Sequence, residues 1–149
     1  MSDVNVLHPT WDAEIPTEAG VLRAARLARN AGGSRLAANL YELEPDTTVS
    51  PLHFHHANEE LLFVLSGTPT LRRGEGDERT LELGEVVAFP VGPAGTHQIV
   101  NRSAGRARVL ICATNDAPEV AEQVETGMLA VLTGTDLRLV ADAPAITPP

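Results

Sequence analysis

The histidines are the residues of this sequence whose types and spacing are most suited to chemistry. Three of the five lie within four consecutive positions, as His53, His55 and His56. On an extended strand, alternate side chains point to the same side, so His53 and His55 share one face and His56 faces the opposite way. Two imidazoles on one face form a pair of nitrogen ligands for zinc, iron, nickel, copper or manganese. His56 is therefore expected to be exposed at the surface and not to bind the metal.

A carboxylate and a third imidazole extend this pair. Glu60 opens the apolar run 60–65, whereas Glu59 faces the opposite side of the same strand. A carboxylate among apolar side chains is costly to bury unless a cation compensates its charge. A further histidine, His97, follows a loop rich in proline and glycine. The sequence therefore predicts one divalent metal ion held by His53, His55, Glu60 and His97.

Short runs of β-type composition, separated by turn residues, are the elements that must position these side chains. The expected strands are residues 35–43, 49–55, 60–65, 68–73, 79–83, 85–89, 96–101 and 106–114. Many short strands at close spacing indicate an all-β sandwich or barrel. Residues 21–30 also suit a helix, because they are rich in alanine and arginine, but their neighbours favour a strand. Residues 116–125 carry an early proline and acids in the first turn, which predicts a short C-terminal helix.

The length of 149 residues fits one domain. We divide the chain into an N-terminal segment, residues 1–34, that packs on the barrel, a barrel core, residues 35–115, and a C-terminal extension, residues 116–149. The prolines at positions 144, 148 and 149 predict that the extension ends without regular structure. The N-terminal segment, which contains His8 and Trp11, either covers the barrel or pairs with another subunit, and the sequence leaves both readings open.

Residues 45–67, with HFHHANEELLFVLSG at their centre, resemble the first motif of the cupin superfamily. In that motif, two histidines one residue apart are followed by three or four residues, a glutamate, six residues and a glycine. Here His55 is followed by four residues, Glu60, six residues and Gly67. The six-residue spacing selects Glu60 as the ligand, in agreement with strand parity. Thr47 stands where the motif usually opens with glycine.

The second cupin motif is matched further along the chain. Its pattern is a glycine, five residues, a proline, one residue, a glycine, two residues, a histidine, three residues and an asparagine. Gly84, Pro90, Gly92, His97 and Asn101 follow this order, but four residues separate Gly92 from His97 instead of two. This longer loop resembles that of some small single-domain bacterial cupins. Asn101 is expected to serve a turn or strand pairing and not to bind the metal.

The resemblance implies an antiparallel jelly-roll barrel with a metal bound by the matched histidines and glutamate. In the family, two adjacent positions on the metal stay open for water or substrate, as in catalytic metal sites generally. Cupins commonly pair as dimers, so a homodimer is expected. Some cupin lyases use a tyrosine near the metal, and Tyr41 is the only tyrosine here. Strand parity predicts that the pocket is lined by Leu62, Val64, Phe89 and Ile99 in addition to Tyr41.

Such a lining is mostly apolar and favours a small organic ligand over a heavily charged sugar phosphate. Two further residues are expected outside the site. Gln98 neighbours His97 on the strand and points away from the metal, and Cys112 is read as a buried small apolar residue and not as a thiol ligand.

Composition excludes several classes of partner. The formal charge is −9, and the only local groups of arginines are at 23, 26 and 29, at 72 and 73, and at 102, 106 and 108. We read these groups as solvated surface positions, so neither nucleic acid nor an anionic membrane is an expected partner. No apolar run approaches the roughly 18 to 20 residues of a membrane span. The single cysteine and an N-terminus without the features of a secretory signal favour the cytoplasm.

Three functions are compatible with these features. The first is a metal-dependent enzyme acting on a small organic substrate, such as an oxygenase, isomerase, decarboxylase or other lyase. The second is a non-catalytic binding or storage module, which is favoured by the lack of a residue clearly placed as a general base. The third is a structural cupin whose metal site is empty. The ligand set suits Zn, Fe, Ni or Mn and does not select among them.

Overall fold

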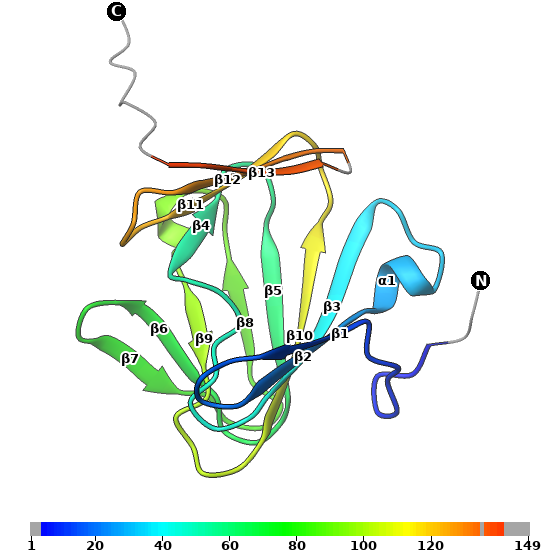
Figure 1. Cartoon of the computed structure of the whole chain (residues 1–149), viewed down its shortest axis with the longest axis vertical. Helices are drawn as coiled ribbons and strands as arrows, with labels where there is room; N and C mark the ends of the chain where they lie inside the picture. Colours follow the sequence, from blue (N-terminus) through cyan, green and yellow to red (C-terminus); the bar gives the residue numbers. More distant parts are fainter. Residues whose placement is uncertain (1–3, 135, 142–149) are drawn as a thin grey trace, which may run out of the picture.

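The computed structural model of the chain describes residues 4–134 and 136–141 and is built almost wholly from β-strands (Figure 1). In chain order its elements are β1 (Ala13–Pro16), β2 (Val21–Arg26), α1 (Leu27–Asn30), β3 (Leu36–Leu43), β4 (His53–His55), β5 (Glu60–Ser66), β6 (Thr70–Gly74), β7 (Asp77–Thr80), β8 (Val86–Phe89), the 3-10 turn η1 (Pro93–Gly95), β9 (Gln98–Val100), β10 (Ala107–Thr114), β11 (Glu119–Gln123), β12 (Leu129–Thr133) and β13 (Asp136–Val140). The all-β prediction is confirmed.

The strands form three antiparallel sheets around one core. The orders are β1-β2-β3-β10-β5-β8, β13-β12-β11-β4 and β7-β6-β9. Alternate residues of the long strands point inward, as the pleat of a strand requires. Buried side chains from the first and third of these sheets, together with one just after β7, meet in one cluster, consisting of Leu22, Leu43, Leu62, Val64, Leu71, Leu81, Val87, Phe89, Ile99, Val109 and Ile111.

Several local assignments differ from expectation, and two of them concern the type of element. Residues 21–30 begin as strand β2, which pairs with β3, and end in the single turn α1. Residues 119–123 form strand β11 and not the predicted C-terminal helix, because β11 pairs with β4 and with β12. The early proline and acids are compatible with a helix start, but backbone pairing with these two neighbours decides the outcome. The predicted irregular end of the chain, from residue 142 onward, lies outside the described residues.

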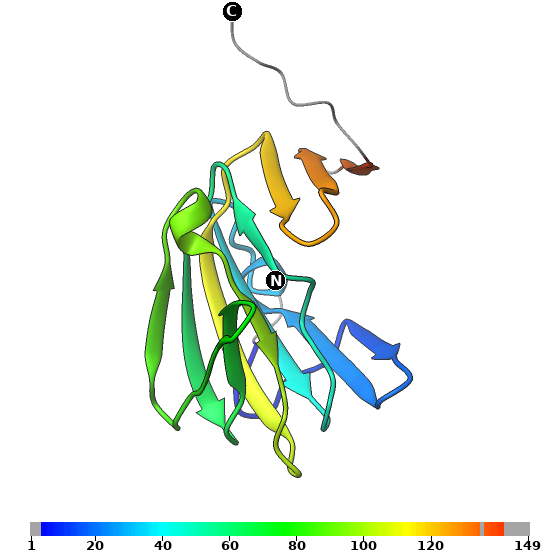
Figure 2. The same ribbon diagram turned by 90° about the vertical axis from the view of Figure 1, so that its left-hand side faces the viewer.

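The C-terminal strands lie across one end of the barrel, as the two views in Figures 1 and 2 agree. At the other end of the sequence, Trp11 packs against the outer cluster of Ala25, Leu27 and Leu40. The N-terminal segment therefore covers part of the outer face of the largest sheet. No helix among residues 4–134 and 136–141 has the length and apolar character needed to cross a bilayer.

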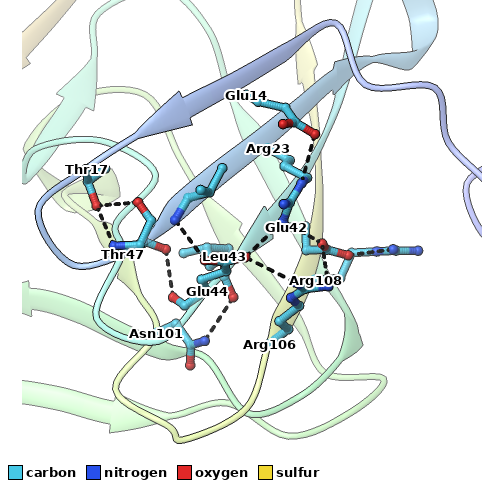
Figure 3. Close-up of polar contacts among 12 residues, drawn as sticks. Glu14, Thr17, Arg23, Glu42, Leu43, Glu44, Thr47, Asn101, Arg106 and Arg108 are labelled. Carbon is cyan, nitrogen blue, oxygen red and sulfur yellow. Dashed lines mark hydrogen bonds and ion pairs between the residues drawn. The ribbon is translucent and has the colours of Figure 1, made fainter.

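Arginines beside β3 are held by two glutamates (Figure 3). Arg23 Nη1 lies 3.3 Å from Glu42 Oε1, and Arg108 Nη2 lies 2.7 Å from Glu42 Oε2. Arg106 Nη2 lies 3.2 Å from Glu44 Oε1. The side chains of Arg23 and Arg108 are only 17% and 22% exposed. These two arginines are therefore ion-paired and largely covered, in contrast to the solvated positions expected from the sequence.

Asn101 is buried at the junction of two loops and binds backbone groups. Its amide nitrogen donates to the carbonyl oxygens of Leu43, at 3.0 Å, and Gly105, at 2.7 Å. Its amide oxygen accepts from the backbone N–H of Ser103 at 3.1 Å. Figure 3 shows the bond to Leu43. Asn101 thus closes a turn, as expected from its position in the motif.

Replacing Asn101 with alanine is expected to lower the free energy of unfolding by about 2 to 3 kcal/mol, because buried carbonyl groups then lose their donor. Urea unfolding would measure the loss. The control Ser103→Ala removes a hydroxyl but keeps the amide bonds, and we expect it to cost less than about 1 kcal/mol. Equal stabilities of Asn101→Ala and wild type would show that these bonds contribute nothing.

Candidate metal centre

Backbone pairing brings the histidines of the two motifs together. His53 and His97 form an isolated antiparallel bridge, in which His53 N–H donates to His97 O at 3.1 Å and His97 N–H donates to His53 O at 2.9 Å. His55 lies two residues along β4 on the same face, and Glu60 begins β5. Residues far apart in the sequence thus meet near one end of the barrel.

The side-chain atoms of these four residues face one another. His53 Nε2 lies 3.1 Å from His55 Nε2. Glu60 Oε2 lies 3.4 Å from His55 Nε2 and 3.1 Å from His97 Nε2. His53, Glu60 and His97 each offer a ligand atom within 4.8 Å of the other two, so this trio could hold a metal ion.

These separations fit a shared ion. Ligand atoms bound at about 2.0 to 2.2 Å from a metal lie roughly 2.8 to 3.6 Å apart when they are neighbours in octahedral or tetrahedral geometry. Glu60 Oε2 is also buried without a hydrogen-bond donor in the described part of the chain, despite its short contacts with two imidazoles. A buried carboxylate oxygen without a donor is costly, and a bound cation would compensate it. The residues present therefore fit a divalent metal.

The other ring nitrogens fix two of the imidazoles. His53 Nδ1 lies 2.8 Å from the carbonyl oxygen of Pro51, and His97 Nδ1 lies 2.8 Å from that of Gly95. A carbonyl only accepts, so each Nδ1 carries the proton and each Nε2 keeps its lone pair for a metal. The ring of Phe89 stacks on that of His97 at a centroid distance of 3.7 Å, which restricts its rotation.

The electrostatics of the cluster favour an ionised Glu60 and a neutral His53. Burial lowers the pKa of His53 to about 4, and the neighbouring His97 acts in the same direction. Burial also opposes the charged form of His55, but the Glu60 carboxylate outweighs it and raises the pKa of His55. Burial would raise the pKa of Glu60, yet the His55 and His97 imidazoles hold that pKa well below its usual range. His53 is thus neutral and Glu60 ionised at neutral pH.

The longer loop of the second motif is accommodated by η1, which delivers His97 to the site. Gly95 ends this turn and lies against the chain that leaves β8. A Cβ atom at Gly95 would lie 1.9 Å from the carbonyl oxygen of Pro90, which no side chain tolerates. Gly95 also supplies the carbonyl oxygen that His97 Nδ1 contacts. The absence of a side chain at Gly95 therefore helps to fix the position of the candidate ligand His97.

Gly95→Ala is therefore expected to displace η1 and to weaken metal binding by about 10-fold or more, in line with the loss of an outer-shell partner. Gly105→Ala is a matched control, because a Cβ at Gly105 meets nothing within 4 Å. Isothermal titration of both variants with Zn²⁺ would measure the difference. Unchanged affinity of Gly95→Ala would mean that the loop does not set the position of His97.

A cavity of about 230 Å³ adjoins the four candidate ligands. Besides them, its lining consists of Asn39, Tyr41, Val49, Ser50, Ile99 and Ile111. Tyr41 and Ile99 were expected in this lining. Burial and the Glu60 charge raise the pKa of Tyr41, so its hydroxyl stays protonated at neutral pH.

Three residues expected to line the cavity do not do so. Leu62, Val64 and Phe89 are at most 1% exposed and belong to the packed core. They face inward as parity predicts, but the barrel interior at their level is filled by neighbouring side chains. The alternation of side chains along a strand predicts which side each one faces. It does not predict how far a cavity extends into the barrel.

Three further residues named in the sequence analysis, His56, Gln98 and Cys112, are not among the residues that line the cavity. His56 is exposed, with Nε2 3.0 Å from Glu122 Oε2. Gln98 accepts a hydrogen bond from Arg72 at 3.0 Å and donates to the carbonyl oxygen of Ser50 at 2.9 Å. Cys112 is half-buried, and so less covered than the buried position expected from the sequence.

Sequence reasoning missed Asn39 and Ser50 in the cavity and Glu119 behind His55. Glu119 Oε1 lies 3.8 Å from His55 Nδ1. The parity shared by Asn39 and Tyr41 on β3 could have pointed to Asn39. No local signal identified Glu119, because residues 116–125 were read as a helix.

The family model of the cupin domain matches residues 39–113, which is 75 of the 149 residues and includes all four candidate ligands. Solved structures of cupin proteins share the jelly-roll fold. A sugar phosphate isomerase from a cupin superfamily, of Silicibacter pomeroyi, is 28% identical with a TM-score of 0.74, and the match covers 81% of this chain and 76% of that one. A putative sugar phosphate isomerase from Acidithiobacillus ferrooxidans is 25% identical with a TM-score of 0.75, covering 86% and 82%.

A third similar structure is the polyketide cyclase RemF from Streptomyces resistomycificus. It is 26% identical with a TM-score of 0.64, and the match covers 83% of this chain and 85% of that one. The search of curated proteins gave no match. Similar folds therefore accompany different named activities, and the fold alone does not select a reaction.

Proposed function

The chain belongs to the cupin family, and we propose that it holds one divalent metal ion through His53, His55, Glu60 and His97 and acts on a small organic molecule in the adjoining cavity. The observation that carries this proposal is the cluster of His53, Glu60 and His97 at the cavity wall, with His55 in contact with His53 and Glu60. When bound, an ion with open positions would polarise an oxygen-bearing ligand, or bind oxygen if it is iron. The ligand set suits Zn, Fe, Ni or Mn.

The cavity favours a compact ligand with oxygen atoms. Its volume of about 230 Å³ is smaller than most sites for drug-sized molecules. Tyr41 and Asn39 lie on the same face of β3 and add a hydroxyl and an amide to its wall. No lysine or arginine is among the described lining residues, so a phosphate group would lack the cationic partner that such groups usually have. We therefore favour an uncharged molecule, or one whose charge faces the metal, over a sugar phosphate.

The chain's own residues have defined roles in this proposal. Tyr41 keeps its proton at neutral pH and can donate a hydrogen bond to a ligand oxygen. Ile99 and Ile111 cover apolar parts of the ligand and exclude water. The Nδ1 contacts of His53 and His97 orient both rings without involving the ligand.

A second function, binding without turnover, is favoured by one observation. Apart from the proposed metal ligands, Tyr41 is the single ionisable side chain among the described cavity residues, so a general base is not evident. Such a protein would retain a ligand stoichiometrically and release it unchanged.

Turnover of a panel of small oxygenated substrates by metal-loaded protein distinguishes these functions. We expect product from wild type and at least about 100-fold less from His53→Ala, as for loss of a metal-bound centre. Tyr41→Phe tests the hydroxyl and should reduce turnover by about 10-fold or more. Product formation that persists in His53→Ala would refute a metal-dependent enzyme, and ligand retention without product would favour the binding module.

A further inference from the structure

We propose that Glu119, on the C-terminal strand β11, is a positioning residue that holds His55 in the orientation needed for metal binding. This inference rests on the proposed function, because it assigns His55 Nε2 to a metal. It places part of the site outside residues 39–113, the part of the chain that the cupin family model matches.

Glu119 is a buried carboxylate in a fixed position. It is 5% exposed, and Oε1 accepts the backbone N–H groups of His56, at 3.1 Å, and Ala57, at 3.3 Å. Oε2 accepts the side-chain amide of Asn58 in a short hydrogen bond. Asn58 Oδ1 in turn accepts from the hydroxyl of Thr114, at the end of β10, and from the backbone N–H of Asp116. Glu119 is thus tied to the three residues that follow His55.

His55 is the histidine whose second nitrogen lacks a backbone partner. His53 and His97 each place Nδ1 against a carbonyl oxygen at 2.8 Å. His55 Nδ1 is buried without a hydrogen bond in the described part of the chain, and Glu119 Oε1 lies 3.8 Å away. A movement of about 0.8 Å would bring the pair to hydrogen-bonding distance. Glu119 therefore lies on the Nδ1 side of His55, the side on which the rings of His53 and His97 each contact a carbonyl oxygen.

A carboxylate in this place has a defined effect on a metal ligand. An acceptor at Nδ1 keeps the proton on that nitrogen, leaves the Nε2 lone pair for the metal and makes the ring a stronger donor. The register of the sheet supports the arrangement, because Ala121 of β11 pairs with His55 of β4. β11 therefore supplies both the backbone partner of β4 and the carboxylate behind its second histidine.

The alternative is that Glu119 only caps the turn after β4. Glu119→Gln keeps an oxygen that can accept from the N–H groups of His56 and Ala57, but it loses the charge facing His55 and the acceptor for the Asn58 amide. The loss at Asn58 affects stability and is read from unfolding of the metal-free protein, whereas the loss at His55 affects metal affinity. Glu122→Gln is the matched control. Glu122 lies three residues along the same segment, and its side chain contacts the exposed His56 and none of the proposed ligands.

The test is competition for Zn²⁺ between each full-length protein and a chromophoric chelator, with thermal unfolding of the metal-free proteins alongside. Loss of an outer-shell partner typically weakens metal binding by about 10- to 100-fold. We expect that loss in Glu119→Gln and less than about a twofold change in Glu122→Gln. Wild-type affinity in Glu119→Gln would overturn the positioning role alone. Failure of wild type itself to bind Zn²⁺ would overturn the proposed function and this inference together.

A second measurement covers the case in which Glu119→Gln does not fold. In Zn²⁺-loaded wild type, nitrogen-15 NMR of the histidine rings should show a protonated Nδ1 on His55, with a proton that exchanges slowly and is shifted downfield by the carboxylate. A turn cap without contact to the ring would not produce this signal. A His55 Nδ1 proton that exchanges as fast as that of an exposed ring would overturn the proposal.

Discussion

Replacing His53 with alanine is expected to weaken binding of Zn²⁺ by about 10²- to 10³-fold. Zinc sites with four protein ligands bind with roughly 10 to 16 kcal/mol, so one ligand contributes on the order of 3 kcal/mol. His53 Nε2 faces the other ligand atoms, and the ring is already neutral at pH 7 because burial lowers its pKa to about 4. No proton has to leave before it binds. Isothermal titration calorimetry with Zn²⁺ measures the change.

His56→Ala is the matched control for this experiment. His56 is a histidine from the same four-residue cluster, but it is exposed and contacts Glu122. Its removal should leave the affinity for Zn²⁺ within about twofold of wild type, as for most exposed polar contacts. Equal losses in His53→Ala and His56→Ala would show that the metal binds loosely to surface histidines and that the cluster has no special role.

Removal of the metal by a chelator is expected to lower the midpoint of thermal unfolding by about 8 to 16 °C. A ligand that binds only the folded protein, at 1,000 times its Kd, stabilises it by about 4 kcal/mol. For a domain of this size, each kcal/mol shifts the midpoint by roughly 2 to 4 °C. The physical reason is the buried Glu60 oxygen, which has no hydrogen-bond donor in the described chain and needs a cation. Differential scanning calorimetry with and without chelator measures the shift.

The same comparison in His53→Ala provides the control, because a protein that no longer retains metal should unfold at a midpoint that the chelator hardly changes. If wild type unfolds at one temperature with Zn²⁺ and with excess chelator, the cluster does not bind an ion that stabilises the fold. Stability would then come from the packed core alone.

The four candidate ligands could be predicted from the sequence because short segments of the chain are enough to identify them. Two positions on one strand place His53 and His55 on one face, and motif spacing selected Glu60 and His97. The structure brings these side chains within a few ångströms of one another. The fold class was predictable for a related reason, since short strands between glycine, proline and asparagine turns fit few architectures other than a barrel or sandwich.

What the sequence could not show depends on contacts between distant segments. Glu119 reaches His55 because β11 pairs with β4, more than 60 residues away in the chain. Residues 116–125 were read as a helix from an early proline and acidic residues, and that misassignment hid the carboxylate. Local propensity is weak compared with the pairing of a strand between two neighbours.

The extent of the cavity was also beyond the sequence. Alternation along β5 correctly directed Leu62 and Val64 inward, but both are packed in the core. Asn39, by contrast, lines the cavity at a position that appeared unremarkable in the strand. Which inward residues reach open space depends on how side chains from several strands fill the barrel, and no single strand carries that information.

Anomalous X-ray scattering at the zinc absorption edge, from crystals of the full chain grown with Zn²⁺, would locate the ion. We expect one strong peak per chain, about 2.0 to 2.2 Å from His53 Nε2, His55 Nε2, His97 Nε2 and a carboxylate oxygen of Glu60. A map without a peak among these atoms, or with the ion held elsewhere by other residues, would contradict this expectation.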